Sequence, residues 1–125
     1  MNKFFFFFLP VFLFGFFIRF PYEISLKKDQ TVKFKVYYLK YTYPFEMRWT
    51  LYKNGYIVVL YKFNNFPRQV MLTKNYPLDS FKVEIAKFPL FYPYLFIKFV
   101  DFNDKIATFK IFLYNGKSVR VEEIK

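Results

Sequence analysis

Apolar and polar residues alternate with a period of two through most of the chain after residue 20. Between residues 31 and 38, Val32, Phe34 and Val36 share one face, and two lysines lie on the other. The same alternation returns at 45–51 and 81–85, in segments rich in aromatic and β-branched residues. Successive side chains of a strand point to opposite faces of a sheet, so this period indicates half-buried β-strands. The pattern predicts an all-β domain.

Turn-forming sequences divide this region into about eight strands joined by short connections. The turn signals are Tyr43-Pro44, Asn54-Gly55, Asn64-Asn65-Phe66-Pro67, Tyr76-Pro77-Leu78-Asp79, Asn103-Asp104 and Asn115-Gly116. Short strands at regular spacing are typical of a β-sandwich or a barrel. We find no linker in this region. We therefore predict that residues 21–125 form a single antiparallel β-sandwich domain.

The hydrophobic pattern also predicts how the strands near the C-terminus pair, because a slip of one residue would move every side chain to the opposite face. A three-residue loop at 103–105 places Phe99 opposite Phe109 and Ile97 opposite Ile111. A three-residue loop at 115–117 places Leu113 opposite Val119 and Lys110 opposite Glu122. The result is a three-stranded meander with one apolar face, our predicted core: Leu95, Ile97, Phe99, Phe109, Ile111, Leu113, Val119 and Val121.

A second meander is predicted between residues 31 and 63. Its inward-facing residues are Met47, Trp49, Leu51, Val59 and Tyr61. Two meanders stacked face to face bury both apolar surfaces and form a β-sandwich.

An apolar segment precedes the predicted domain. The fifteen residues from Phe4 to Ile18 carry no charge and follow Lys3. As a helix they would span roughly 22 Å, less than the hydrocarbon core of a bilayer and about the length of a signal-peptide core. Small residues suited to signal peptidase are missing around 16–21, so we expect an uncleaved hydrophobic helix at residues 1–20 that acts as a signal anchor.

This segment sets the expected location of the protein. Residues 4–18 would contact the membrane, and the C-terminal domain would be exported to the periplasm or the extracellular side. Positive charges lie on both sides of the segment, so they do not decide its orientation. The alternative is that the segment is a buried element of a soluble fold, although five consecutive phenylalanines leave no polar face for solvent.

Composition excludes several kinds of chemistry. The chain has no cysteine and no histidine. It therefore cannot form disulfides, thiolate metal sites or histidine-based acid–base systems, and we expect no catalytic residue, no metal and no cofactor. The formal net charge is +11. That charge suits an anionic partner, but the abundance of Phe, Lys, Tyr, Asn and Ile would also follow from an AT-rich genome.

The outward face of the C-terminal meander is the best candidate for a partner-binding patch. It would interleave aromatic and basic side chains: Phe96, Lys98, Phe102, Lys110, Phe112 and Arg120. Such surfaces bind single-stranded nucleic acid, anionic glycans, lipid head groups or protein partners. A purely structural alternative is a cross-strand phenylalanine pair covered by lysine stems, with Glu122 and Lys110 as a surface ion pair.

Two other features have ordinary structural explanations. Asp101 and Asp104 could form a paired-carboxylate site, but acidic residues at a strand end and a turn are common. The segment from Lys87 to Tyr94 contains Pro89 and Pro93, so it cannot lie inside a central strand. It is either an exposed contact for the bilayer or a neighbouring subunit, or a crossover loop.

These observations favour a non-catalytic binding or assembly module tethered to the membrane of a bacterial envelope. Its partners would be the membrane itself and a protein or an anionic envelope component, with nucleic acid a weaker candidate. The alternatives are a cytosolic nucleic-acid binder with an OB-like barrel, which requires that the N-terminal segment is not an export signal, and a carboxylate-dependent hydrolase.

Overall fold

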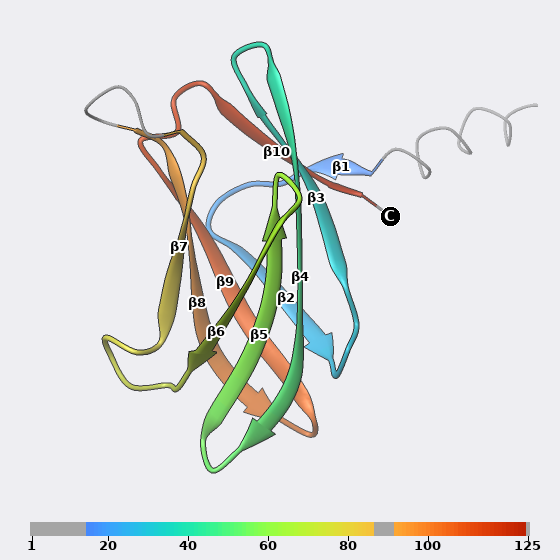
Figure 1. The fold of residues 1–125 in the computed structure, drawn as a ribbon, viewed down its shortest axis with the longest axis vertical. Coiled ribbons are helices and arrows are strands. Elements are labelled where there is room, and N and C mark those ends of the chain that lie inside the picture. The colour runs from blue at the N-terminus through green and yellow to red at the C-terminus, as the bar shows by residue number, and fades with distance from the viewer. Residues whose placement is uncertain (1–14, 87–91, 125) are drawn as a thin grey trace, which may run out of the picture.

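The chain folds into two antiparallel β-sheets. The computed structural model describes residues 15–86 and 92–124, and within them it contains ten strands and no helix (Figure 1). The all-β antiparallel prediction is confirmed, with ten strands in place of about eight. The helix predicted at residues 1–20 lies mostly outside the described residues. Among the residues described, no helix is long and apolar enough to span a membrane.

One sheet has six strands and the other has four. The six-stranded sheet has the order β1 (Phe16–Phe17), β10 (Val119–Ile124), β3 (Val32–Tyr38), β4 (Tyr41–Lys53), β5 (Tyr56–Phe63) and β6 (Phe66–Leu72). The four-stranded sheet has the order β2 (Tyr22–Lys27), β9 (Ile106–Tyr114), β8 (Tyr94–Asn103) and β7 (Ser80–Glu84). The overall arrangement resembles a β-sandwich.

The apolar faces of both sheets supply the hydrophobic core. Phe34, Phe45 and Val59 of the six-stranded sheet are fully buried with Ile97 and Phe109 of the four-stranded sheet. These are the alternating positions that the sequence pattern assigns to strand interiors. One polar contact also crosses between the sheets, since the indole N–H of Trp49 donates to the carbonyl oxygen of Leu26 at 2.8 Å.

The meander predicted for residues 31–63 is confirmed. Strands β3, β4 and β5 are consecutive neighbours, and β6 extends the same meander. Met47, Trp49 and Val59 are buried as expected, and Tyr61 packs against the core. The hairpin between β4 and β5 turns at Asn54-Gly55, where both residues have positive φ as a type I′ turn requires.

Leu51 is not in the core, contrary to the prediction. Trp49 is 3% exposed, but Leu51 is 50% exposed. The β4–β5 register shifts between these two residues, so a β-bulge inserts one extra residue and reverses the faces that follow it. Tyr52 then packs against the core in place of Leu51.

The turn predicted at Tyr43-Pro44 is also absent. Both residues lie within β4, and the preceding hairpin turns at Leu39-Lys40. Pro44 pairs with Lys35 of β3, while β5 ends at Phe63. The N–H of Asn64, just after β5, donates to the Pro44 carbonyl oxygen at 2.8 Å, and Pro44 has no N–H to donate in return, which suits a position at the end of the β4–β5 ladder.

The register predicted for β8 and β9 is confirmed in the body of the hairpin. Phe99 lies opposite Phe109, and Ile97 lies opposite Ile111. The loop itself differs, because Asn103 pairs with Ile106 and leaves only two residues in the turn. A bulge between Phe99 and Asp101 adds the residue that the shorter turn removes.

Strand β10 does not continue this meander, and the prediction of a three-stranded C-terminal meander is wrong. It lies in the six-stranded sheet between β1 and β3, while β2 occupies the place beside β9. Val121 therefore pairs with Val36, and Glu122 with Lys35. Val119 and Val121 remain buried because they enter the same core from the opposite side. The alternation of β10 specifies which residues are buried but not which sheet they belong to.

The sheet begins within the apolar N-terminal segment. Phe16 and Phe17 form β1 and pair with Glu123 and Glu122 of β10. The backbone N–H of Ile18 donates to the carbonyl oxygen of Val121 at 2.9 Å, and the Ile18 side chain is buried. Residues 16–18 of the predicted anchor are therefore part of the folded body, which begins before residue 21.

Candidate partner-binding surface

Strands β8 and β9 bring together four of the six residues predicted for the partner-binding patch. Phe96 lies opposite Phe112, with ring centroids 6.2 Å apart, and Lys98 lies opposite Lys110. These positions alternate with the buried residues of the two strands, so all four side chains are on the outer face of the four-stranded sheet.

Additional aromatic side chains extend this surface toward the start of β8. Tyr94 and Tyr114 are paired across the strands and stack with centroids 5.3 Å apart. The ring centroids of Tyr92 and Tyr94 are 5.9 Å apart, and the ammonium of Lys82 on β7 lies 4.4 Å from the centre of the Tyr94 ring. We call this surface the aromatic–lysine face, and it consists of Lys82, Tyr92, Tyr94, Phe96, Lys98, Lys110, Phe112 and Tyr114.

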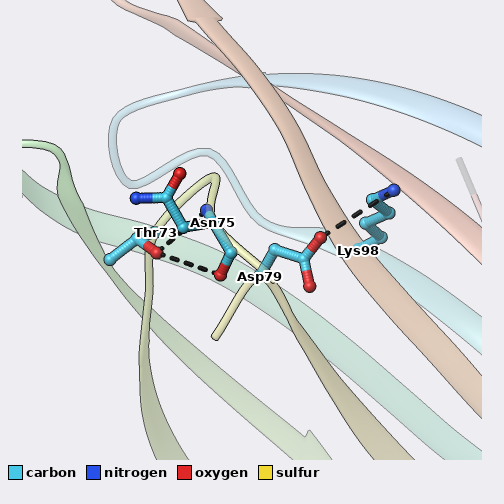
Figure 2. A network of polar contacts seen from close by, with 4 residues as sticks. All are labelled: Thr73, Asn75, Asp79 and Lys98. Atoms are coloured by element: carbon cyan, nitrogen blue, oxygen red, sulfur yellow. Dashed lines mark hydrogen bonds and ion pairs between the residues drawn. The ribbon is translucent and has the colours of Figure 1, made fainter. Parts of the chain in front are cut away.

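A polar network at the edge of this face holds Lys98. The Lys98 ammonium lies 3.8 Å from a carboxylate oxygen of Asp79 (Figure 2). The residue Asp79 is only 5% exposed. The carbonyl oxygen of Asp79 also accepts from the backbone N–H of Phe99 at 2.7 Å. The loop between β6 and β7 is thereby fixed against β8.

Thr73 closes the other side of that loop. Its hydroxyl accepts from the backbone N–H of Asn75 at 3.1 Å (Figure 2). Its own N–H donates to the carbonyl oxygen of Leu78 at 2.9 Å. These contacts position Asp79, so Lys98 has a fixed carboxylate neighbour. Lys110 lies across from Glu23 of β2 in the same sheet. The cationic character of the aromatic–lysine face is therefore partly compensated.

Phe102 is not on the outer face, contrary to the prediction. It lies after the β8 bulge, which reverses the alternation, and its ring faces the core. Phe102 stacks on Tyr52 at 3.8 Å between centroids and meets Trp49 edge to face at 5.4 Å. Its role is to join the ends of the two sheets.

Arg120 is not on this face either, because β10 belongs to the six-stranded sheet. Its guanidinium carbon lies 4.6 Å from the centre of the Phe17 ring and 5.9 Å from that of Tyr37. The ion pair between Glu122 and Lys110, which belonged to the structural alternative, is absent for the same reason, and Glu122 accepts from the Tyr37 hydroxyl at 2.8 Å. Arg120 helps to hold β1 against the sheet.

The two aspartates do not converge. Asp101 forms an ion pair with Lys74 at 3.5 Å, and Asp104 occupies the β8–β9 turn with a φ of 53°. Within the described ranges, no group of three or more potential metal ligands occurs.

Most of the proline-containing connector lies outside the described residues, which leave out 87–91. Pro93 is described and buried, and its carbonyl oxygen accepts from the backbone N–H of Ile85 at 3.0 Å.

Three tyrosines have pKa values raised above the ordinary value. Burial, together with the hydrogen bond to Glu123, raises the pKa of Tyr22, and the hydrogen bond to Glu122 raises that of Tyr37. Burial raises the pKa of Tyr61. These phenols stay protonated at neutral pH, so they act as hydrogen-bond donors rather than as bases.

The sequence interpretation missed four members of the aromatic–lysine face. Tyr94 and Tyr114 lie two residues from Phe96 and Phe112, so the same alternation could have identified them. Lys82 and Tyr92 could not be assigned, because the pairing of β7 depends on a long connection that contains two prolines.

Comparisons with protein-family models, curated proteins and solved structures gave no match. The function must therefore be argued from the chain's own surface chemistry.

Proposed function

We propose that this protein is a non-catalytic binding or assembly module of a bacterial envelope. Its apolar N-terminal segment tethers it to the membrane, and its aromatic–lysine face contacts the partner. The observation that carries the proposal is the row of aromatic rings on an outer sheet face, in register with lysines of three strands.

The chemistry of the aromatic–lysine face suits an anionic partner. Aromatic rings provide large contact areas at a small cost in side-chain entropy, and lysines attract negative charge over longer distances. Lys82 and Lys98 are exposed, and Tyr114 is 44% exposed. An anionic envelope polymer or an acidic protein surface would satisfy both properties.

Strand β1 takes up the end of the apolar run, which shortens the part of that run available to a membrane. The apolar run of the sequence leads directly into Phe16, which is already paired with β10. The module would therefore lie at the surface of the membrane that its leader enters. This supports contact with an envelope component in preference to a cytosolic one.

The nucleic-acid alternative retains one supporting observation. Exposed aromatic rings beside lysines could stack bases and neutralise phosphates. The two-sheet topology, however, differs from the five-stranded barrel of an OB-fold. A single-stranded oligonucleotide is therefore included as a competing ligand in the test below.

The test compares two double variants with the same loss of charge. Lys98→Ala/Lys110→Ala alters the aromatic–lysine face, and Lys33→Ala/Lys35→Ala alters the outer face of the six-stranded sheet. We expect the first variant to lose binding to detergent-solubilised envelope components by about tenfold, the effect of about 1.4 kcal/mol, and the second to bind normally. Each tagged chain is extracted from membranes, and its bound material is quantified.

Three outcomes would contradict the proposal. Equal binding by both variants would remove the aromatic–lysine face as the contact surface. Recovery of the unmodified protein in the soluble fraction without detergent would remove the tether. Displacement of the bound material by an oligonucleotide at lower concentration than by an anionic polymer would favour the nucleic-acid alternative.

A further inference from the structure

The outer edge of β6 has no neighbouring strand among the described residues. In the described part of the chain, β6 pairs only with β5 and forms one margin of the six-stranded sheet (Figure 1). The β5–β6 hairpin turns at Asn64 and Asn65, whose φ values of 53° and 68° indicate a type I′ turn. A two-residue turn of this kind makes Phe63 and Phe66 the hydrogen-bonded closing pair.

The register then determines which backbone groups of β6 point outward. Hydrogen-bonded and non-hydrogen-bonded pairs alternate along an antiparallel ladder. Counting from Phe66, the residues directed away from β5 are Pro67, Gln69 and Met71. Pro67 fits this assignment because it has no N–H to donate. Gln69 and Met71 therefore present their N–H and carbonyl groups at the edge of the sheet.

Two hollows include residues of β6 in their lining, one on each face of the sheet. The first, of about 650 Å³, lies over the outer face of the sheet and includes Leu60, Pro67 and Gln69 in its lining. The second, of about 680 Å³, lies where β5 and β6 face β7 and includes Phe63 and Phe66. A strand added to β6 would direct alternate side chains to the two faces of the sheet, beside these hollows.

The lining of the hollows favours negative charge. Arg68 lines both of them. The first also contains Arg48 and Lys62 against one carboxylate, that of Glu46. The second contains Lys82 against Glu84. Cations therefore exceed acids in the first hollow and in the second, within a chain whose formal net charge is +11.

The same residues disfavour pairing between two copies of this chain. Two β6 strands brought together would place one Arg68 close to the other, and each Pro67 would remove a donor from the shared ladder. Edge prolines and charges are ordinary protection against self-association. A strand that carries carboxylates would meet no such repulsion.

We propose that β6 binds an extended, acidic peptide segment of a partner protein by addition of a strand to the six-stranded sheet. Gln69 and Met71 supply the backbone hydrogen bonds, and Arg68 selects the acidic side chains. This surface is on a different sheet from most of the aromatic–lysine face, and the inference does not depend on the proposed function.

The probe is a fluorescein-labelled peptide of eight residues in which glutamate alternates with valine. Its binding to the full chain in detergent is measured by fluorescence anisotropy. A second peptide carries N-methyl groups on alternate amides, which keeps its charge but prevents strand pairing along one edge. A third replaces glutamate with lysine. We expect the first peptide to bind at least about tenfold more tightly than either control, as expected from lost backbone hydrogen bonds and reversed charge.

Matched variants test the edge itself. Gln69→Pro removes the outward N–H and should weaken binding about tenfold, whereas Gln69→Ala keeps the N–H and should change it less than about threefold. Arg68→Glu should also weaken binding, and Lys53→Glu, the same change of charge elsewhere, should not. Amide exchange at Gln69 and Met71 should slow when the peptide is added to the unmodified protein.

The proposal fails if the acidic peptide does not bind, or if the N-methylated and unmodified peptides bind equally. The comparison of peptides uses the unmodified protein, so it remains decisive even if Gln69→Pro does not fold. Lys82 belongs to both surfaces, but Lys98 and Lys110 line neither hollow. Loss of binding in the Lys98→Ala/Lys110→Ala variant would therefore leave these results unchanged, and the two proposals fail separately.

Discussion

Two glycines with nearly the same backbone conformation have different surroundings. Gly15 and Gly55 have φ values of 82° and 83°, a region that side chains rarely adopt. A Cβ at Gly15 would collide with the carbonyl oxygen of Glu123, while a Cβ at Gly55 would have no atom within 4 Å. Only the first glycine therefore permits a close approach between two backbones.

Replacing each glycine with alanine separates backbone strain from collision. Gly55→Ala should cost about 1–2 kcal/mol of stability through its left-handed conformation alone. Gly15→Ala should in addition displace β1 from β10, and amide exchange at Ile18 should accelerate at least about tenfold because its hydrogen bond to Val121 opens more often. Equal exchange at Ile18 in both variants would show that β1 does not depend on this contact.

At the residue scale, alternation predicts burial correctly up to the first bulge. Met47 and Trp49 precede the β4 bulge and are buried, while Leu51 follows it and is exposed. Phe102 follows the β8 bulge and turns inward in the same way. A bulge of this kind depends on the fit of two strands and has no consistent residue signature, so the sequence could not locate it.

At the element scale, the sequence predicts where strands occur better than it predicts which strands lie next to each other. The alternation of β10 is the same whether it borders β9 or β3, because both places bury Val119 and Val121 in one core. Which strand β10 borders depends on β2, because β2 already pairs with the edge of β9. Strand β2 precedes β10 by almost a hundred residues in the chain. Long-range competition of this kind leaves no local pattern.

Engineered cysteine pairs can test the position of β10, because the natural chain has no cysteine. Lys35→Cys/Glu122→Cys joins residues that are paired in the sheet, where cross-strand Cα atoms lie within disulfide range. Lys110→Cys/Glu122→Cys joins the pair that the sequence predicted. Under mild oxidation we expect an intramolecular disulfide in the first variant only, detected by mass spectrometry of the non-reduced protein. A disulfide in the second variant alone would place β10 beside β9.

On the scale of the whole molecule, one tyrosine–glutamate hydrogen bond connects the two sheets and another connects two neighbouring strands. Tyr22 of β2 donates to Glu123 of β10, so the four-stranded sheet is linked to the six-stranded sheet. Tyr37 of β3 donates to Glu122 beside it. Both contacts need a protonated phenol, and both tyrosines have a raised pKa in the folded protein.

The raised pKa values predict loss of stability in alkaline solution. The unfolded chain releases these phenolic protons near pH 10, the ordinary pKa, while the folded chain retains them to higher pH. Stability from these contacts is therefore complete below pH 10 and declines as the pH rises above it. Tyr22→Phe should make that decline shallower by at most about 1.4 kcal/mol per pH unit.

Urea unfolding between pH 8 and pH 11.5 measures this slope. Tyr76→Phe is the control, because that side chain is 87% exposed and its loss should leave the slope unchanged. The same slope in the unmodified protein and in Tyr22→Phe would show that the link to Glu123 does not couple folding to the proton.

The candidate surface was predictable where it lies on one hairpin. Phe96, Lys98, Lys110 and Phe112 follow from the alternation and register of β8 and β9 alone. Lys82 and the buried Asp79 come from outside that hairpin, and the hollows beside β6 depend on how the two sheets pack. Surfaces assembled from several distant segments require the tertiary structure.

The pairing of Phe16 with Glu123 has one more consequence. Among the described residues, the sheet begins at Phe16, inside the apolar run of the sequence. Under the proposed tether, the sheet and the membrane segment would share one apolar run, with no polar linker between them in the sequence. The folded body of such a tethered protein would reach no farther from the bilayer than its own dimensions, so the proposed partner would have to come to the bilayer surface.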